Sequence, residues 1–153
     1  MSRSLTTRLL WALTLAFWGF IFVMTHIPQQ RLPGVRVNDK TAHLISYGVL
    51  AAMIYVTLWF SRPHDWSPVW KIPLVLALYA AFDELTQPLV NRFAEFADWY
   101  ADVAGAVIVV AALSILRGVI AVTAQRRMKT ERPTSNFQRP TSNGDKGPLE
   151  VES

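Results

Sequence analysis

Four apolar stretches recur along the chain, over residues 9–24, 41–60, 72–90 and 97–116. Each is near the ~20 residues that a helix needs to cross a bilayer, and shorter polar segments separate them. The pattern predicts an all-α integral membrane bundle of four antiparallel transmembrane helices, contained in residues 1–117.

Composition supports this class, because 52% of the 153 residues are hydrophobic and only 17% are charged. Soluble domains rarely combine these values. The chain has no cysteine, which excludes disulfide frameworks, thiolate metal sites and cysteine nucleophiles. The first stretch ends in Phe22-Val23-Met24. This sequence lacks the small residues of a signal-peptide cleavage site, which favours an uncleaved anchor.

Basic residues predict the orientation of the bundle, because Arg and Lys are retained on the cytoplasmic side during insertion. With both termini inside, the outward-facing basic residues are Arg31, Arg36, Lys40 and Arg92. The cytoplasmic set is larger and comprises Arg3, Arg8, Arg62, Lys71, Arg117, Arg126, Arg127, Lys129, Arg132, Arg139 and Lys146. We therefore expect an N-in, C-in topology.

Residues 118–153 differ in character from the rest of the chain. Apolar periodicity is lost beyond Ala124, and Arg, Pro, Thr, Ser and Asn become frequent. This composition predicts a cytoplasmic, mostly disordered basic tail. Its Arg126-Arg127-Lys129 group suits contact with anionic lipid of the inner leaflet. No folded basic module is evident, so the sequence favours no nucleic-acid partner.

Three polar clusters interrupt the apolar pattern of the last three stretches. They are Asp39-Lys40-x-x-His43-x-x-x-Tyr47, Asp83-Glu84-x-x-Gln87 and Asp98-x-x-x-Asp102-x-x-Gly105. Residues three or four apart share one face of a helix, so each cluster can point into the bundle. Ionisable groups in membrane helices usually carry function. The expected topology brings all three clusters to the outer surface, where they would rim one pocket.

In the first cluster, His43 follows Asp39 by one helical turn. A carboxylate in this position orients an imidazole for use as a general base or as a ligand. A structural hydrogen bond is the alternative. Asp39, or Asn38 before it, also suits an N-cap of the second helix. Tyr47 lies one further turn along the same face.

In the second cluster, Asp83 and Glu84 lie at the end of the third stretch. Two adjacent carboxyl groups favour one that stays protonated near neutral pH, as a general acid requires. Ion pairs with Arg92 or Lys40 are the structural alternative. Gln87 is one turn from Asp83 and is expected to complete a hydrogen-bond network.

Two basic residues near the clusters suit an anionic ligand. Arg92 presents a planar fork for phosphate or carboxylate, and Lys40 adds a second positive charge. A salt bridge from Arg92 to Asp98 or Glu95 is equally compatible with the sequence.

In the third cluster, Asp98 suits either an N-cap or contact with a ligand. Asp102 lies one turn deeper and needs a partner. The candidates are Lys40, Arg92 and His43. A neighbouring stripe of small residues permits close helix approach and consists of Ala97, Ala101 and Gly105.

Several carboxylates with one His are also compatible with a divalent ion held by oxygen and nitrogen ligands. However, the sequence has no compact metal-ligand spacing such as His-Glu-x-x-His, no phosphate-binding glycine loop and no serine elbow. The sequence therefore predicts neither a metal nor another cofactor. The candidate catalytic residues are His43, Asp83, Glu84 and Asp102. The candidate ligand-binding residues are Asp39, Lys40, Tyr47, Gln87, Arg92 and Asp98.

The order of the three motifs, with Arg92 between the second and the third, resembles the VanZ-like membrane protein family over residues 9–116. In that family Pro-Gly-Arg typically follows the second motif, and an Asn stands in the last. Here Val90-Asn91-Arg92 and Asp102 stand instead. The resemblance implies a multi-pass protein of the bacterial cytoplasmic membrane. The family's namesake lends low-level resistance to the glycopeptide teicoplanin.

Two functions stay open at this point. In the first, the pocket binds or modifies an anionic lipid-linked envelope precursor or lipid headgroup. Glu84 and His43 would exchange protons, while Arg92 and Lys40 would hold the anion. In the second, the protein is a non-catalytic accessory or scaffold whose polar cluster stabilises the bundle or binds a partner. A homo-oligomer is compatible with both, and whether the protein is an enzyme is left open.

Overall fold

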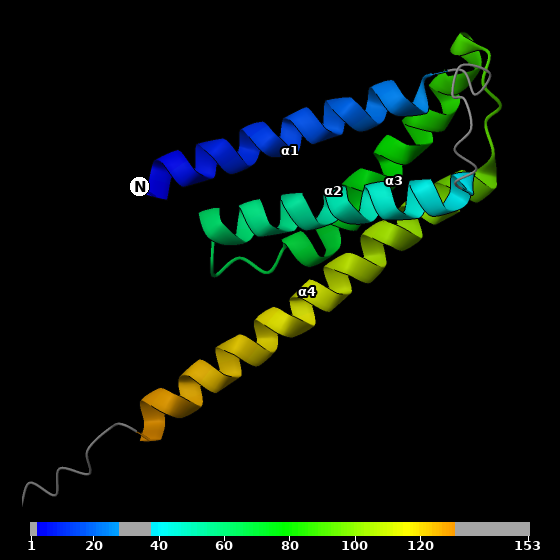
Figure 1. The fold of residues 1–153 in the computed structure, drawn as a ribbon. Coiled ribbons are helices and arrows are strands. Elements are labelled where there is room, and N and C mark those ends of the chain that lie inside the picture. Colours follow the sequence, from blue (N-terminus) through cyan, green and yellow to red (C-terminus); the bar gives the residue numbers. More distant parts are fainter. Residues whose placement is uncertain (1–2, 28–37, 131–153) are drawn as a thin grey trace, which may run out of the picture.

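The computed structural model describes residues 3–27 and 38–130. The described part contains no β-strand, so the all-α prediction is confirmed for it. The chain reverses direction between successive helices (Figure 1). The elements are α1 (Arg3–Thr25), α2 (Asp39–Ser61), α3 (Pro68–Thr86), a short 3₁₀ turn η2 (Gln87–Val90), and α4 (Phe96–Thr130).

Three of the helices are long and apolar enough to cross a membrane, namely α1 from Ser4 onwards, α2 and α4. α3 does not qualify, because its 19 residues include Lys71, Asp83 and Glu84. By length and composition, the structure therefore supports three of the four predicted spans. The fourth span and the N-in, C-in topology stay predictions.

α4 extends further than the apolar pattern predicts. The fourth apolar stretch ends at Leu116, whereas the helix continues to Thr130. Residues 118–130 become polar but keep good helix formers such as Ala, Gln, Arg and Lys, so the helix outlasts the apolar run. The predicted disorder of the remaining tail concerns residues 131–153, outside the described part. Two of the basic residues that the expected topology places outside, Arg31 and Arg36, also lie outside the described part.

The core lies between α2 and α4, which share the most extensive helix contact, and α3 packs against α4. Gly105 makes the close approach possible. A Cβ atom at this position would collide with the carbonyl group of Leu44 and lie 3.2 Å from the backbone nitrogen of Gly48. The predicted close approach of the small-residue stripe is thus confirmed at Gly105.

Arg117 joins α4 to the α2–α3 connection at the end of the bundle opposite the polar clusters. Its guanidinium donates to the carbonyl oxygens of Pro63 at 2.6 Å and Asp65 at 2.9 Å, and lies 4.1 Å from the ring centre of Trp66. These contacts fix the α2–α3 connection to α4. In the same loop, the backbone N–H of Ser67 donates to the Asp65 carboxylate at 2.8 Å and lowers its pKa.

Replacing Arg117 by lysine is expected to lower the free energy of unfolding by about 1–2 kcal/mol. An ammonium group lacks the planar fork, so one of the two carbonyl oxygens would lose its donor. Thermal unfolding of the purified protein in detergent measures this loss. Arg126 is exposed on the same helix, so Arg126→Lys is the control, and equal losses in both variants would contradict the assigned role.

Candidate functional site

The three polar clusters meet at one end of the bundle, where α2 and α4 begin and α3 ends (Figure 1). The convergence that the sequence predicts is thus observed. Seven of the candidate residues are buried there, namely His43, Tyr47, Asp83, Glu84, Gln87, Asp98 and Asp102. Their catalytic and ligand-binding roles stay predictions.

His43 is paired with Asp102 rather than with Asp39. Its Nδ1 lies at hydrogen-bond distance from Asp102 Oδ1, 3.0 Å away, and both side chains are almost fully buried. Nε2 lies 4.0 Å from Asp98 Oδ2. Asp39 is therefore not the hydrogen-bond partner that spacing along α2 suggested, whereas His43 is the one of the three candidate partners of Asp102 that the structure confirms. The close α2–α4 contact at Gly105, one turn beyond Asp102, brings the two residues together.

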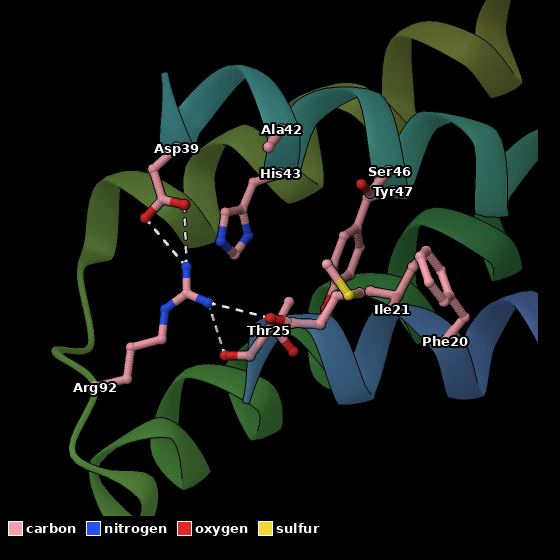
Figure 2. Close-up of a pocket in the computed structure, with 10 residues that line it drawn as sticks. Phe20, Ile21, Thr25, Asp39, Ala42, His43, Ser46, Tyr47 and Arg92 are labelled. Carbon is pink, nitrogen blue, oxygen red and sulfur yellow. Dashed lines mark hydrogen bonds and ion pairs between the residues drawn. The ribbon is translucent and has the colours of Figure 1, made fainter. Parts of the chain in front are cut away.

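Arg92 connects the ends of three elements (Figure 2). Its Nη2 donates to both carboxylate oxygens of Asp39, at 3.0 and 3.1 Å, and Nη1 donates to the carbonyl oxygen of Thr25 at 2.8 Å. The expected salt bridge therefore exists, but its partner is Asp39 instead of Asp98 or Glu95. The Arg92 side chain is only 8% exposed, so most of its donors already serve the protein.

Lys40 is the more accessible of the two cations. Its ammonium group donates to Glu95 at 2.9 Å and lies 3.6 Å from Asp98 Oδ1, with about half of the Lys40 side chain exposed. The backbone N–H of Lys40 donates to the side chain of Asn38 at 3.2 Å. Asn38, and not Asp39, is therefore the N-cap of α2.

Asp83 is held by the end of α1. It accepts a hydrogen bond from the Thr25 hydroxyl at 3.0 Å and lies 3.6 Å from Nδ1 of His26. His26 in turn is 3.0 Å from the hydroxyl oxygen of Thr86. We missed Thr25 and His26 from sequence, although they follow the first apolar stretch where the expected topology places the outer surface.

Glu84 is held by the connection between α3 and α4. It accepts hydrogen bonds from Nε2 of Gln87 at 3.1 Å and from the backbone N–H of Glu95 at 2.9 Å. The network expected of Gln87 is thus present. The alternative ion pairs of Asp83 and Glu84 with Arg92 or Lys40 are not among those that the described residues form.

The turn before Arg92 is preserved although the sequence departs from Pro-Gly-Arg. Asn91 adopts the left-handed conformation with φ 59°, which glycine accepts freely and asparagine tolerates better than most residues. The backbone N–H of Asn91 donates to the Pro88 carbonyl at 3.2 Å, and that of Arg92 donates to the Gln87 carbonyl at 3.2 Å. Asn91 therefore takes the place of the glycine.

A pocket of about 210 Å³ lies between α1 and α2 (Figure 2). Its apolar lining comes mainly from Phe20, Ile21 and Met24. Its polar lining consists of Thr25, Asp39, His43, Ser46, Tyr47 and Arg92. A second pocket of about 420 Å³, beside α3 and α4, is lined by Glu84, Glu95 and the aromatic residues Phe96, Trp99 and Tyr100.

These features define a helical membrane protein with a buried cluster of carboxylates around one histidine. The family model described as VanZ/LLP1 matches residues 5–117, which is more than half of the chain, and the chain belongs to this family. Comparison with curated proteins and with solved structures gave no match.

Proposed function

We propose that this protein is a multi-pass protein of the bacterial cytoplasmic membrane that binds the polar headgroup of a lipid-linked envelope precursor or an anionic lipid. In this proposal all four helices cross the membrane, both termini are cytoplasmic, and the polar site faces outwards. The excess of Arg and Lys that this topology assigns to the cytoplasmic side supports it. The proposal includes a contribution to teicoplanin-type glycopeptide resistance, as in the family's namesake.

The observation that carries the proposal is the mixed character of the pocket between α1 and α2. One side offers Phe20 and Ile21 to an acyl or prenyl chain, while the other offers His43 and Arg92 to a headgroup. A lipid-linked ligand needs both surfaces at once. The volume of about 210 Å³ is below the ~300 Å³ of small ligand pockets, so the pocket suits a headgroup rather than a whole precursor.

In the enzymatic form of the proposal, the buried pair of His43 and Asp102 supplies a general base. His43 would take a proton from an attacking hydroxyl or water, and Asp102 would stabilise the imidazolium that results. Glu84 offers a carboxylate oxygen within 4.8 Å of the ligating atoms of both residues. In its protonated form Glu84 would donate a proton to the leaving oxygen as the bond between this oxygen and the headgroup breaks, and the proton taken by His43 would then restore the acid.

In the non-catalytic form, the same cluster stabilises the bundle while a partner performs the chemistry. The contacts of Arg92 support this second candidate, because its Nη donors bind the Asp39 carboxylate and the Thr25 carbonyl within the protein instead of an anionic ligand. A homo-oligomer is compatible with both forms.

Teicoplanin susceptibility of a sensitive bacterial host tests the function. We expect the parent chain to protect the host and His43→Gln and Glu84→Gln to reduce protection to the level of the empty host. These changes remove proton transfer and keep the size of the side chain. His64 is exposed at the other end of α2, so His64→Gln is the control and should protect like the parent.

Membrane abundance of each variant is matched by immunoblot before the comparison. Protection by all four chains would favour the non-catalytic form, whereas no protection by the parent would contradict the resistance function in that host.

A further inference from the structure

Three buried carboxylates of the polar site lack a permanently charged partner. Asp83 and Asp102 are 0% exposed and Glu84 is 7% exposed. Among the ion pairs of the described residues, none joins them to Lys or Arg, and their basic neighbours are the imidazoles of His26 and His43. A buried carboxylate is costly unless a cation or a proton compensates its charge.

The same site contains buried polar atoms without a hydrogen-bond partner among the described residues. Within the described part of the chain, four buried oxygens of carboxyl and amide groups accept no hydrogen bond, namely Asp83 Oδ2, Gln87 Oε1, Asp98 Oδ1 and Asp102 Oδ2. The fully buried hydroxyl of Tyr47 is likewise without a hydrogen-bond partner. Buried polar atoms are normally paired, so these oxygens are acceptors available to a bound donor or cation.

Three side chains of this site lie close enough together to share one metal ion. His43, Glu84 and Asp102 each offer one ligand atom, and these atoms all lie within 4.8 Å of one another. Bonds from nitrogen and oxygen to zinc are about 2.0–2.2 Å. Two ligand atoms on one ion are therefore separated by about 3–4.4 Å. His43 Nδ1 and Asp102 Oδ1 are 3.0 Å apart, at the short end of this range, so an ion bound by both atoms would displace the proton between them.

A second set of Asp39, His43 and Asp98 is equally compact, but its carboxylates are already compensated. Asp39 binds Arg92 through both oxygens, and Asp98 faces the ammonium group of Lys40 at 3.6 Å. In the set that includes Glu84 and Asp102, neither carboxylate is paired with Lys or Arg among the described residues, and all three side chains are buried.

We propose that His43, Glu84 and Asp102 bind one divalent transition-metal cation. One imidazole and two carboxylates form a ligand set that suits zinc or manganese. The ligands come from α2, α3 and α4. They are therefore far apart in the sequence and form no compact motif. His43 lines the pocket between α1 and α2, and Glu84 lines the pocket beside α3 and α4, so both pockets border the ion.

Metal binding by the purified full chain tests this site independently of the proposed function, because neither teicoplanin nor lipid precursor is needed. The protein in detergent is treated with a chelator, exposed to Zn²⁺ alone or Mn²⁺ alone, desalted, and measured by elemental analysis. We expect about one ion per chain in the parent and in the His64→Gln control. Affinity should fall at least about tenfold in His43→Gln, Glu84→Gln and Asp102→Asn.

Helical circular dichroism and a single chromatographic peak identify the variants that fold. If a variant does not fold, the parent chain provides the test. Zn²⁺ or Mn²⁺ should raise the melting temperature of the parent and of His64→Gln. Retention of less than about a fifth of an ion per chain by the parent, with no metal-dependent rise in melting temperature, would overturn the site. Loss of the ion in Asp98→Asn but not in Glu84→Gln would also overturn it.

Discussion

Replacing Gly105 by alanine is expected to remove most of the folded protein from membranes and to lower the free energy of unfolding by about 3 kcal/mol or more. A Cβ atom at Gly105 would collide with the backbone carbonyl of Leu44. A backbone atom cannot rotate away as a side chain can, so α2 and α4 would have to separate. Membrane abundance by immunoblot and thermal unfolding in detergent measure the effect.

Two other glycines provide a graded control for this prediction. Gly118 lies on the same helix, and a Cβ atom there would meet no other atom within 4 Å, so Gly118→Ala should cost nothing. At Gly48 the nearest atom is Cγ2 of Val109, 3.2 Å away, and this side chain can shift, so Gly48→Ala should cost about 1 kcal/mol or less. Equal stability of the Gly105 and Gly118 variants would contradict the close-contact explanation.

The glycine contact also links packing to the candidate site. Leu44 follows His43, and Gly105 is one turn beyond Asp102, so the distance between α2 and α4 sets the 3.0 Å pairing of the histidine and the aspartate. Separation of the helices would therefore break this pair as well. Gly105, which the sequence assigns to packing, and Asp102, which it assigns to function, therefore depend on the same contact between α2 and α4.

The sequence predicts the elements well, because runs of apolar residues and their interruptions are properties of single helices. It also predicts that the three polar clusters converge, since each lies at a helix end. The end of α4 could not be found in this way. The end of the apolar run indicates where a membrane-spanning segment would end. The helix itself continues for as long as its residues favour helical backbone, here to Thr130.

The pairings within the site were harder to predict, because they form between helices. Spacing along α2 suggested Asp39 for His43, but Asp102 arrives from α4 and takes that place, while Asp39 binds Arg92. Asn91 illustrates the same limit. It stands where the family typically has glycine, so the sequence alone does not show whether the turn is kept. The φ of 59° at Asn91 shows that asparagine occupies the left-handed position.

Replacing Arg92 by alanine is the second change with a large expected effect. We expect the free energy of unfolding to fall by about 3 kcal/mol. The substitution removes charge-assisted hydrogen bonds to Asp39 and a hydrogen bond to the Thr25 carbonyl. Asp39 is 38% exposed, so water compensates part of the loss. Thermal unfolding in detergent measures the change, and Arg62→Ala, at an exposed position after α2, is the control.

A double-mutant cycle with Asp39→Ala separates a structural role of Arg92 from a ligand-binding one. A structural pair should give a coupling energy of about 1–3 kcal/mol in the absence of any ligand, whereas an arginine reserved for an anion should give almost none. Strong coupling would mean that the guanidinium donors are used within the protein. An anionic headgroup would then have to find its positive charge elsewhere in the pocket, and a metal ion on His43 would supply it.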